Sequence, residues 1–251
     1  MGTFNMQISN LARGLLLAAL ALAIRPALAS STVNLTVDSA GAYGYYTNDN
    51  ITINGSTTKH AYLGGNALTN KSTSQTQVSW CVDYYHDIYL GRSYTFNVGT
   101  TADMVKDGFT QSQINSLQGL ANNSYGQVNN RDSSSAFQLA VWAILYGNGQ
   151  VGESSVKNRY TITNGSSFKV SGLSKNIADL AFNFLTSLST PTPNRYQMTY
   201  LFDGLNCTRN CFQDQLVFTP SPVPLPAALP LMASGIGLLG FAARRKKKKP
   251  A

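Results

Sequence analysis

The sequence predicts an α+β protein. One β-rich domain, of sandwich or barrel type, carries about three inserted helices and is flanked by a signal peptide and a C-terminal membrane helix. Three observations support this class. Segments that alternate apolar and polar residues, or are rich in β-branched and aromatic residues, occupy both ends of the central chain. Apolar residues at helical spacing fill its middle. Finally, each end of the 251-residue chain carries an apolar run beside basic residues.

Residues 1–29 have the layout of a secretory signal peptide. Arg13 precedes the apolar run 15–24, and the sequence Ala-Leu-Ala then supplies the small residues that signal peptidases recognise. The apolar run is too short to span a membrane well, which disfavours a retained signal anchor. We therefore expect export, with cleavage before Ser30.

The C-terminal region 220–251 has three parts in a fixed order. These parts are Pro224 and Pro226, the apolar run 227–243, and a basic block that begins with Arg244 and Arg245. A helix over the apolar run would be only about 25 Å long, which makes a marginal membrane span. By the positive-inside tendency, the basic block stays in the cytoplasm and the preceding domain lies outside. An ordinary tail anchor has the same features.

The net charge of +8 belongs to the two ends of the chain. Of 19 Lys and Arg, two lie in the signal segment and six in the tail, which leaves 11 against the 11 Asp and Glu. The domain 30–219 is therefore neutral and has no basic stripe, which argues against a nucleic-acid partner. Two histidines without clustered carboxylates provide no metal-ligand spacing. The glycines of 63–65 lack the strand–helix setting and the lysine of a phosphate loop, so we expect neither metal nor cofactor.

Strands are predicted in two groups within the domain. The first group comprises 32–37, 50–55, 77–90 and 93–98, and the second comprises 195–202 and 214–220. Turn-forming residues separate the early segments, and Gly91 divides 77–90 from 93–98. We expect those last two segments to pair with each other.

Three helices are predicted between the strand groups. The first spans 110–123, with Thr110 as its N-cap, and the third spans 174–189, with Ser174 as its N-cap. The second covers 133–147 and is almost wholly apolar. A helix without a polar face is typical of a buried position in the core.

The three cysteines differ in their surroundings. Cys207 and Cys211 are close enough in sequence to close a small loop, and an exported protein favours their pairing as a disulfide. Cys81 is then left over in the aromatic segment Ser-Trp-Cys-Val-Asp-Tyr-Tyr. A buried free thiol can serve simply as a small hydrophobic residue.

Gln138 is the one polar residue between Ala136 and Tyr146. Ser135 and Gln138 fit a capping box, which would stabilise the helix start by about 1 kcal/mol. That interpretation leaves Cys81 unexplained, whereas one reaction uses both residues. A thiol can attack a glutamine carboxamide and expel ammonia, which leaves an intrachain thioester. An amine or hydroxyl of another molecule then opens the thioester to give an amide or an ester.

Two short motifs resemble those of bacterial thioester domains, the Cys–Gln surface adhesins. Residues 138–142, Gln-Leu-Ala-Val-Trp, match the Gln-x-Ala-aliphatic-Trp motif, and 80–83, Trp-Cys-Val-Asp, are similar to the aromatic-Cys-aliphatic motif. The resemblance implies a thioester between Cys81 and Gln138. The residues that it implies as supports of the bond are Trp80, Ala140 and Trp142. Phe137 departs from the family, which usually has Thr or Ser just before the glutamine.

The C-terminal region is similar to the PEP-CTERM sorting signal of Gram-negative bacteria. Here Leu225 stands where the Glu of that signal is usual, which gives a Pro-Leu-Pro variant. The resemblance implies a membrane-anchored precursor, processing by an exosortase (a membrane protease), and a final place at the cell surface or outside the cell. Producers of such proteins typically make extracellular polysaccharide or biofilm matrix.

Together these features predict an exported adhesion or matrix protein, not an enzyme. Its partners would be the exosortase and an amine- or hydroxyl-bearing surface molecule or polysaccharide. One alternative is an inert structural matrix or biofilm protein with the same fold and no thioester. Another is an enzyme with Cys81 as nucleophile and His86 as base. These two residues are five positions apart and would point to opposite faces of a strand, which disfavours the enzyme.

The basic block at 244–249 can be tested by deletion. Its removal should leave export intact but disturb retention and processing, because the N-terminal signal alone directs secretion. Cell fractionation and the mass of the processed protein would measure the effect. Unchanged fractionation and an unchanged processed mass in the truncated strain would contradict the sorting interpretation.

Overall fold

A computed structural model of the chain describes most of the domain. The described residues are 31–48, 50–58, 61–147, 155–158, 161–164, 167–190, 193–205, 207 and 210–222. The predicted signal peptide 1–29 lies outside them, as do Pro224, Pro226, the run 227–243, Arg244 and Arg245. No helix in the described part of the chain has both the length and the apolar character needed to cross a membrane.

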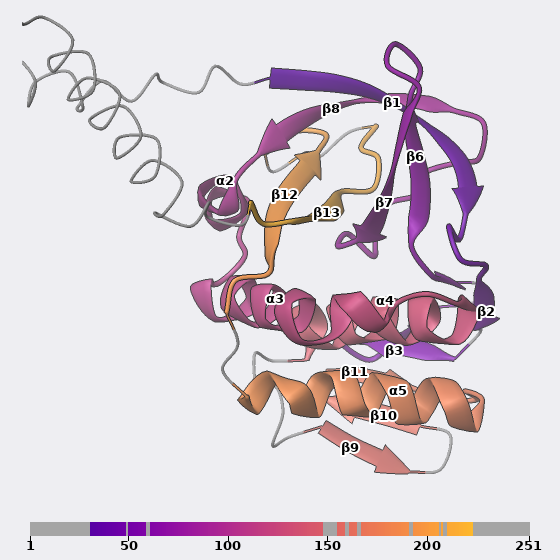
Figure 1. Ribbon diagram of the computed structural model, residues 1–251. Coiled ribbons are helices and arrows are strands. Elements are labelled where there is room, and N and C mark those ends of the chain that lie inside the picture. The colour runs from indigo at the N-terminus through magenta and orange to yellow at the C-terminus, as the bar shows by residue number, and fades with distance from the viewer. Residues whose placement is uncertain are drawn as a thin grey trace, which may run out of the picture.

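Six antiparallel strands close into a barrel in the order β1–β6–β7–β13–β12–β8 (Figure 1). Their bounds are β1 Ser31–Ala40, β6 Asn66–Asn70, β7 Gln75–Cys81, β8 Ser93–Gly99, β12 Tyr196–Phe202 and β13 Gln215–Pro220. Closure pairs every strand on both sides and so removes open sheet edges. One hydrophobic cluster comes from these strands alone: Leu35, Val37, Leu68, Phe96, Leu201 and Val217. The α+β class and the barrel form of the predicted domain are thereby confirmed.

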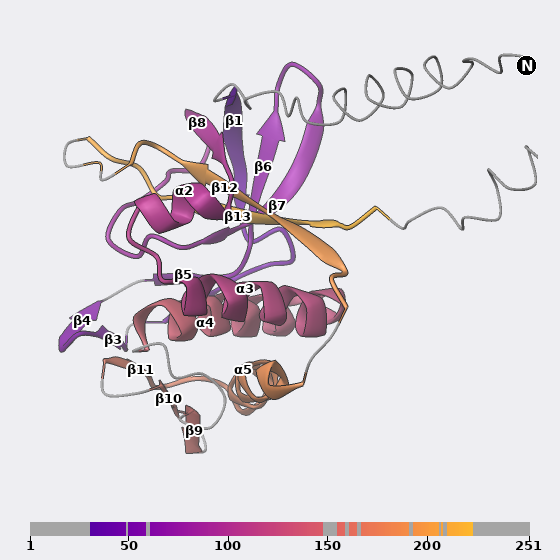
Figure 2. The ribbon, with the colours of Figure 1, turned by 90° about the vertical axis from the view of Figure 1, so that its left-hand side faces the viewer.

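The described helices lie between β8 and β12 in the sequence; α3, α4 and α5 lie below the barrel, and α2 lies beside it, next to β12 and β8 (Figure 1). They are α2 Thr101–Lys106, α3 Gln111–Ser124, α4 Arg131–Tyr146 and α5 Lys175–Thr186, with single 3-10 turns at Tyr125–Gln127 and Ser187–Ser189. Figure 2 shows α3 and α4 directly beneath the barrel, with α5 on their far side. Helices α3, α4 and α5 thus form two layers against one end of the barrel.

Two smaller sheets complete the fold. The five-stranded sheet has the order β4–β3–β11–β10–β9, and the two-stranded sheet pairs β2 with β5. The bounds are β2 Tyr46–Asn48, β3 Ile51–Ile53, β4 Ser56–Thr58, β5 Ala61–Leu63, β9 Ser155–Asn158, β10 Thr161–Asn164 and β11 Phe168–Val170. The larger sheet lies beside α5, on the side of α4 away from the barrel (Figures 1 and 2).

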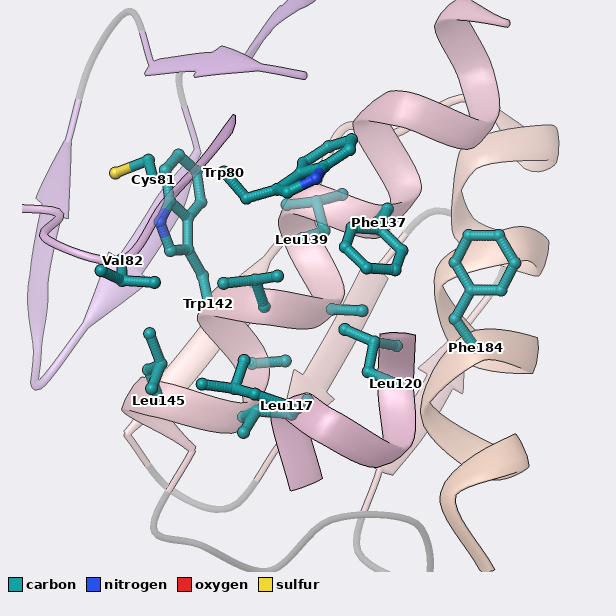
Figure 3. Close-up of a cluster of buried hydrophobic side chains, with 14 of the residues drawn as sticks. Trp80, Cys81, Val82, Leu117, Leu120, Phe137, Leu139, Trp142, Leu145 and Phe184 are labelled. Atoms are coloured by element: carbon teal, nitrogen blue, oxygen red, sulfur yellow. The ribbon is translucent and has the colours of Figure 1, made fainter. Parts of the chain in front are cut away.

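Helix α4 is the central element of the molecule. It contacts α3, α5, the barrel strand β7 and strands of both smaller sheets. Every residue from Ser133 to Leu145 is buried. Figure 3 shows its side chains packing toward β7 on one side and toward Phe184 of α5 on the other. A helix covered on all sides needs no polar face, which accounts for its apolar sequence.

The predicted N-caps Thr110 and Ser174 are confirmed, and α4 ends at Gly147 as expected. The expectation of about three helices was one short, because it missed α2. Helix α2 is only six residues long, too short for a periodic apolar pattern. Its N-cap Thr100 nevertheless forms a capping box with Asp103, a local signal that a search for periodicity does not use.

The predicted strand 77–90 was wrong beyond Cys81, where β7 ends. The Asp83 carboxylate accepts a hydrogen bond of 3.0 Å from the Tyr85 N–H, so a local turn replaces extended backbone there. The expected pairing with 93–98 was also wrong. Strand β7 pairs with β6 and β13, whereas β8 pairs with β1 and β12.

The capping box of Ser135 and Gln138 was wrong as well. The N-cap of helix α4 lies five residues before Ser135, at Asn130, and Ser133 is its capping-box partner. Gln138 therefore lies two turns inside the helix, where a cap has no role. The predicted range 133–147 began two residues late, because Arg131 and Asp132 are polar and do not extend the apolar pattern.

Gly65, between β5 and β6, provides a test of packing around the barrel end. A Cβ atom there would lie 2.6 Å from Val78 Cγ1 and 3.0 Å from the Trp80 ring. Gly65→Ala should therefore lower the free energy of unfolding by about 1–3 kcal/mol. Gly204→Ala is the control, because nothing lies within 4 Å of its Cβ position. Chemical denaturation of both variants would check this, and equal stability losses would contradict it.

Candidate functional site

The structure places the side chain of Gln138 against the backbone of Cys81. Gln138 Oε1 accepts a hydrogen bond of 3.0 Å from the Cys81 N–H, and Gln138 Nε2 donates one of 2.8 Å to the Cys81 carbonyl. Gln138 is 0% exposed and Cys81 is 4% exposed. The two residues that the sequence singles out are thus neighbours in a nearly water-free site.

The end of strand β6 explains why this position needs a carboxamide. Strand β6 pairs with β7 only as far as Asn66 opposite Ser79. Alternate residues of a strand direct their N–H and C=O groups to the same side, so Cys81 faces the same side as Ser79. No residue of β6 is there to meet it. The Gln138 carboxamide provides both an N–H donor and a C=O acceptor. It therefore bonds to Cys81 as the backbone of a further β6 residue would.

Two serines of α4 support this arrangement. The Ser134 hydroxyl accepts a hydrogen bond of 3.0 Å from the Gly65 N–H, and the Ser135 hydroxyl donates one of 2.8 Å to the Leu63 carbonyl. These contacts bind the segment just before β6 to α4, beside the end of β7. Sequence analysis missed Ser134, which lies one turn before Gln138 and bonds to Gly65. The available signal was their i, i+4 spacing, which places both on one face of an otherwise apolar helix.

The sulfur of Cys81 lies in a shielded environment. Its thiol donates a hydrogen bond of 3.2 Å to the Asp83 carbonyl. Burial raises the pKa of the Cys81 thiol well above its usual value, and the charges of Asp83 and Asp214 raise it further. The Trp142 indole N–H opposes this rise. The thiol is therefore protonated at neutral pH and protected from oxidants.

Trp142 lies next to the cysteine, as Figure 3 shows. Its indole N–H is buried and has no hydrogen-bond partner in the described part of the chain, although it is near enough to influence the Cys81 sulfur. Its ring packs edge-on against Tyr84, with centroids 5.1 Å apart. Buried N–H groups without a partner are uncommon in folded proteins, so this one is a donor that a group beside Cys81 could use.

The other predicted supporting residues are part of the core. Ala140 is fully buried, and Trp80 packs against Phe137 with ring centroids 4.6 Å apart. Phe137 also contacts Phe184 of α5 (Figure 3). A hydroxyl-bearing residue at position 137 would therefore lie among aromatic rings, which explains why this chain has Phe there.

Cys81 and Gln138 lie in the wall of a pocket of about 930 Å³. Trp142 also lines it, together with tyrosines of β5 and of the loop that follows β7. The volume lies within the range of about 300–1,000 Å³ typical of ligand pockets. A molecule bound in the pocket would therefore lie close to the pair, although Gln138 itself is 0% exposed.

The remaining candidate residues lie elsewhere. Cys207 and Cys211 form a disulfide with an S–S distance of 2.14 Å. With Asp203 they are the only residues in the described ranges grouped closely enough to hold a metal ion, but their sulfurs are bonded to each other. His86 contacts the Asp83 carboxylate and lines a second pocket, of about 340 Å³, that Cys81 does not line.

Comparison with known proteins adds no relative: no family model matches the chain, and no curated protein matches it. The likeness to thioester domains therefore depends on the two motifs. The geometry around Cys81 and Gln138 is independent of that likeness.

A buried acidic group lies beside the site, on the other side of β7. The Tyr200 hydroxyl contacts the carboxylates of both Asp107 and Asp214, at 2.8 Å from Asp214. The hydroxyl has one hydrogen, so it can donate a hydrogen bond to only one of the two carboxylates at a time. Burial raises the pKa of Asp214 to about 7, and the charges of Asp83 and Asp107 contribute to the rise. Asp214 therefore holds a proton well above the pH at which an exposed aspartate loses it.

This shift predicts a pH-dependent stability. The pKa of Asp214 rises from 3.8 to about 7 on folding, so the folded state binds the proton more tightly. The melting temperature should fall as pH rises through this interval and then level off. Asp214→Asn should remove most of the fall, whereas Asp38→Asn, at an exposed carboxylate, should retain it. Calorimetry from pH 4 to pH 8 would measure both; an unchanged slope in Asp214→Asn would contradict the assignment.

Proposed function

We propose that this chain is an exported, surface-sorted protein that attaches covalently to a nucleophile-bearing partner through a thioester between Cys81 and Gln138. The observation that supports this most is the placement of the Gln138 carboxamide against Cys81 by two hydrogen bonds, in the wall of a pocket. Export and sorting by an exosortase rest on the sequence segments 1–29 and 220–251. The domain itself would act as an adhesion or matrix module and not as an enzyme.

The bond would form in one displacement. The Cys81 sulfur attacks the carboxamide carbon of Gln138, the C–N bond breaks, and the thiol proton leaves with the nitrogen as ammonia. The Cys81 N–H already donates to Gln138 Oε1 and would stabilise negative charge on that oxygen as the carbon becomes tetrahedral. The Trp142 N–H is a second donor beside the sulfur.

A nucleophile of the partner would then open the thioester. An amine or hydroxyl attacks the same carbon, the C–S bond breaks, and the proton of the nucleophile passes to the Cys81 sulfur. Residue 138 then carries an amide or ester to the partner. The raised pKa of the Cys81 thiol makes it a poor leaving group, and burial excludes water, so the thioester would survive until a bound nucleophile reaches it.

An inert structural protein is the second candidate, and one observation favours it. The Gln138 carboxamide already satisfies the Cys81 N–H and C=O, and the Cys81 thiol already donates to the Asp83 carbonyl. A buried polar network that is complete without a covalent bond is what a purely structural role requires. The two candidate functions differ in whether a covalent bond joins Cys81 to Gln138, and that bond can be measured.

The mass of the purified protein distinguishes them. A thioester makes the wild-type chain lighter by one ammonia, hides Cys81 from thiol reagents and exposes it after methylamine treatment. Cys81→Ala and Gln138→Ala should each abolish the mass deficit. Gln118→Ala is the matched control, because Gln118 also donates to a backbone carbonyl, at 2.8 Å from Tyr196 O, and should retain the deficit.

The same variants report on stability. Cys81→Ala should cost about 1–3 kcal/mol through a small cavity. Gln138→Ala should cost more, because it also leaves the Cys81 N–H and C=O buried without partners. Full unreacted mass in the wild type, together with no thiol release by methylamine, would leave the structural role as the function of Gln138.

A further inference from the structure

The pocket at Cys81 and Gln138 has an unusual lining of tyrosines. Four of them line it: Tyr62, Tyr84, Tyr85 and Tyr89. Tyr62 is 56% exposed, Tyr85 64% and Tyr89 55%. Large apolar side chains left in solvent together mark a surface for binding rather than for folding.

The charged groups at the pocket indicate which class of ligand it would bind. Among the residues that the structure describes, Asp87 is the one charged residue that lines it. The other polar lining residues are neutral, and they include Ser56, Asn66 and Gln213. A phosphorylated or acidic polymer would meet the Asp87 carboxylate, and the nearby Arg92 guanidinium is stacked on the Tyr89 ring. A neutral ligand fits this lining better.

The tyrosines indicate which kind of neutral ligand the pocket would bind. A tyrosine offers an apolar ring face and a hydroxyl at its tip. A sugar ring is the complementary shape, with C–H faces that stack on aromatic rings and hydroxyls around its edge. The Arg92 guanidinium lies 5.1 Å from the centre of the Tyr89 ring, which restrains that ring at the pocket.

We infer that this pocket binds a neutral saccharide and presents one of its hydroxyls to the carbon of Gln138. The saccharide-binding part depends only on the pocket. The acceptor part rests on the proposed function: the sugar hydroxyl attacks the thioester, the C–S bond breaks, and its proton passes to Cys81. The product is an ester between the sugar and residue 138.

Binding can be measured without the thioester. The full chain carrying Cys81→Ala would be titrated with maltohexaose and with cellohexaose by isothermal calorimetry. At least one of them should bind, and adding Tyr85→Ala or Tyr89→Ala should weaken it by about tenfold. Tyr43→Ala is the control, because Tyr43 is 37% exposed but does not line the pocket. Failure of both oligosaccharides to bind, or an equal effect of Tyr43→Ala, would overturn the saccharide site.

The acceptor is tested in the wild-type chain with the oligosaccharide that binds. Methylamine first reports whether the thioester exists. If it does, an adduct of the sugar's mass that alkali removes, with release of the Cys81 thiol, supports the ester. Faster reaction with N-acetyl-lysine methylamide than with the sugar would overturn the hydroxyl acceptor. Sugar binding without any methylamine reaction would refute the thioester and the acceptor, but would leave the binding site supported.

Discussion

The structure depends on how the polar groups of a fully buried helix are satisfied. Helix α4 is buried from Ser133 to Leu145, so the donors and acceptors of these side chains need partners inside the protein, and the Trp142 N–H is an exception. Gln138 finds both partners on Cys81. This pair of hydrogen bonds joins the helical layer to the end of a barrel strand, and an apolar residue in its place could not do so.

Other polar side chains of α4 also form hydrogen bonds to the backbone around the helix. Ser134 and Ser135 hold the segment that enters β6, and Tyr146 holds the segment that leaves β7. The Tyr146 hydroxyl donates to the Val82 carbonyl at 2.9 Å and accepts from the Tyr84 N–H at 3.0 Å. One helix thus fixes the chain on both sides of Cys81, and the tyrosine-lined pocket opens beside it.

The burial of Cys81 and Gln138 has two consequences for the reactions that they can undergo. It keeps the Cys81 thiol protonated, which makes the cysteine a poor free nucleophile. It also excludes the water that would hydrolyse a thioester. A reaction that occurs once, within the folded chain, with its carbonyl oxygen already hydrogen-bonded, suits such a site better than repeated turnover does. On the proposed function, the aromatic pocket would be the route by which a partner reaches the pair.

The sequence by itself predicted much of the secondary structure and singled out Cys81 and Gln138, because local patterns carry that information. Alternation predicted most barrel strands, caps at Thr110 and Ser174 marked two helix starts, and an isolated polar residue in an apolar helix pointed to Gln138. Only the tertiary structure decided which strand pairs with the end of β7 and what Gln138 contacts. Cys81 of β7 pairs with Gln215 of the distant strand β13, and the carboxamide's hydrogen bonds join residues 57 positions apart. Periodicity along the chain carries no information about such distant pairs.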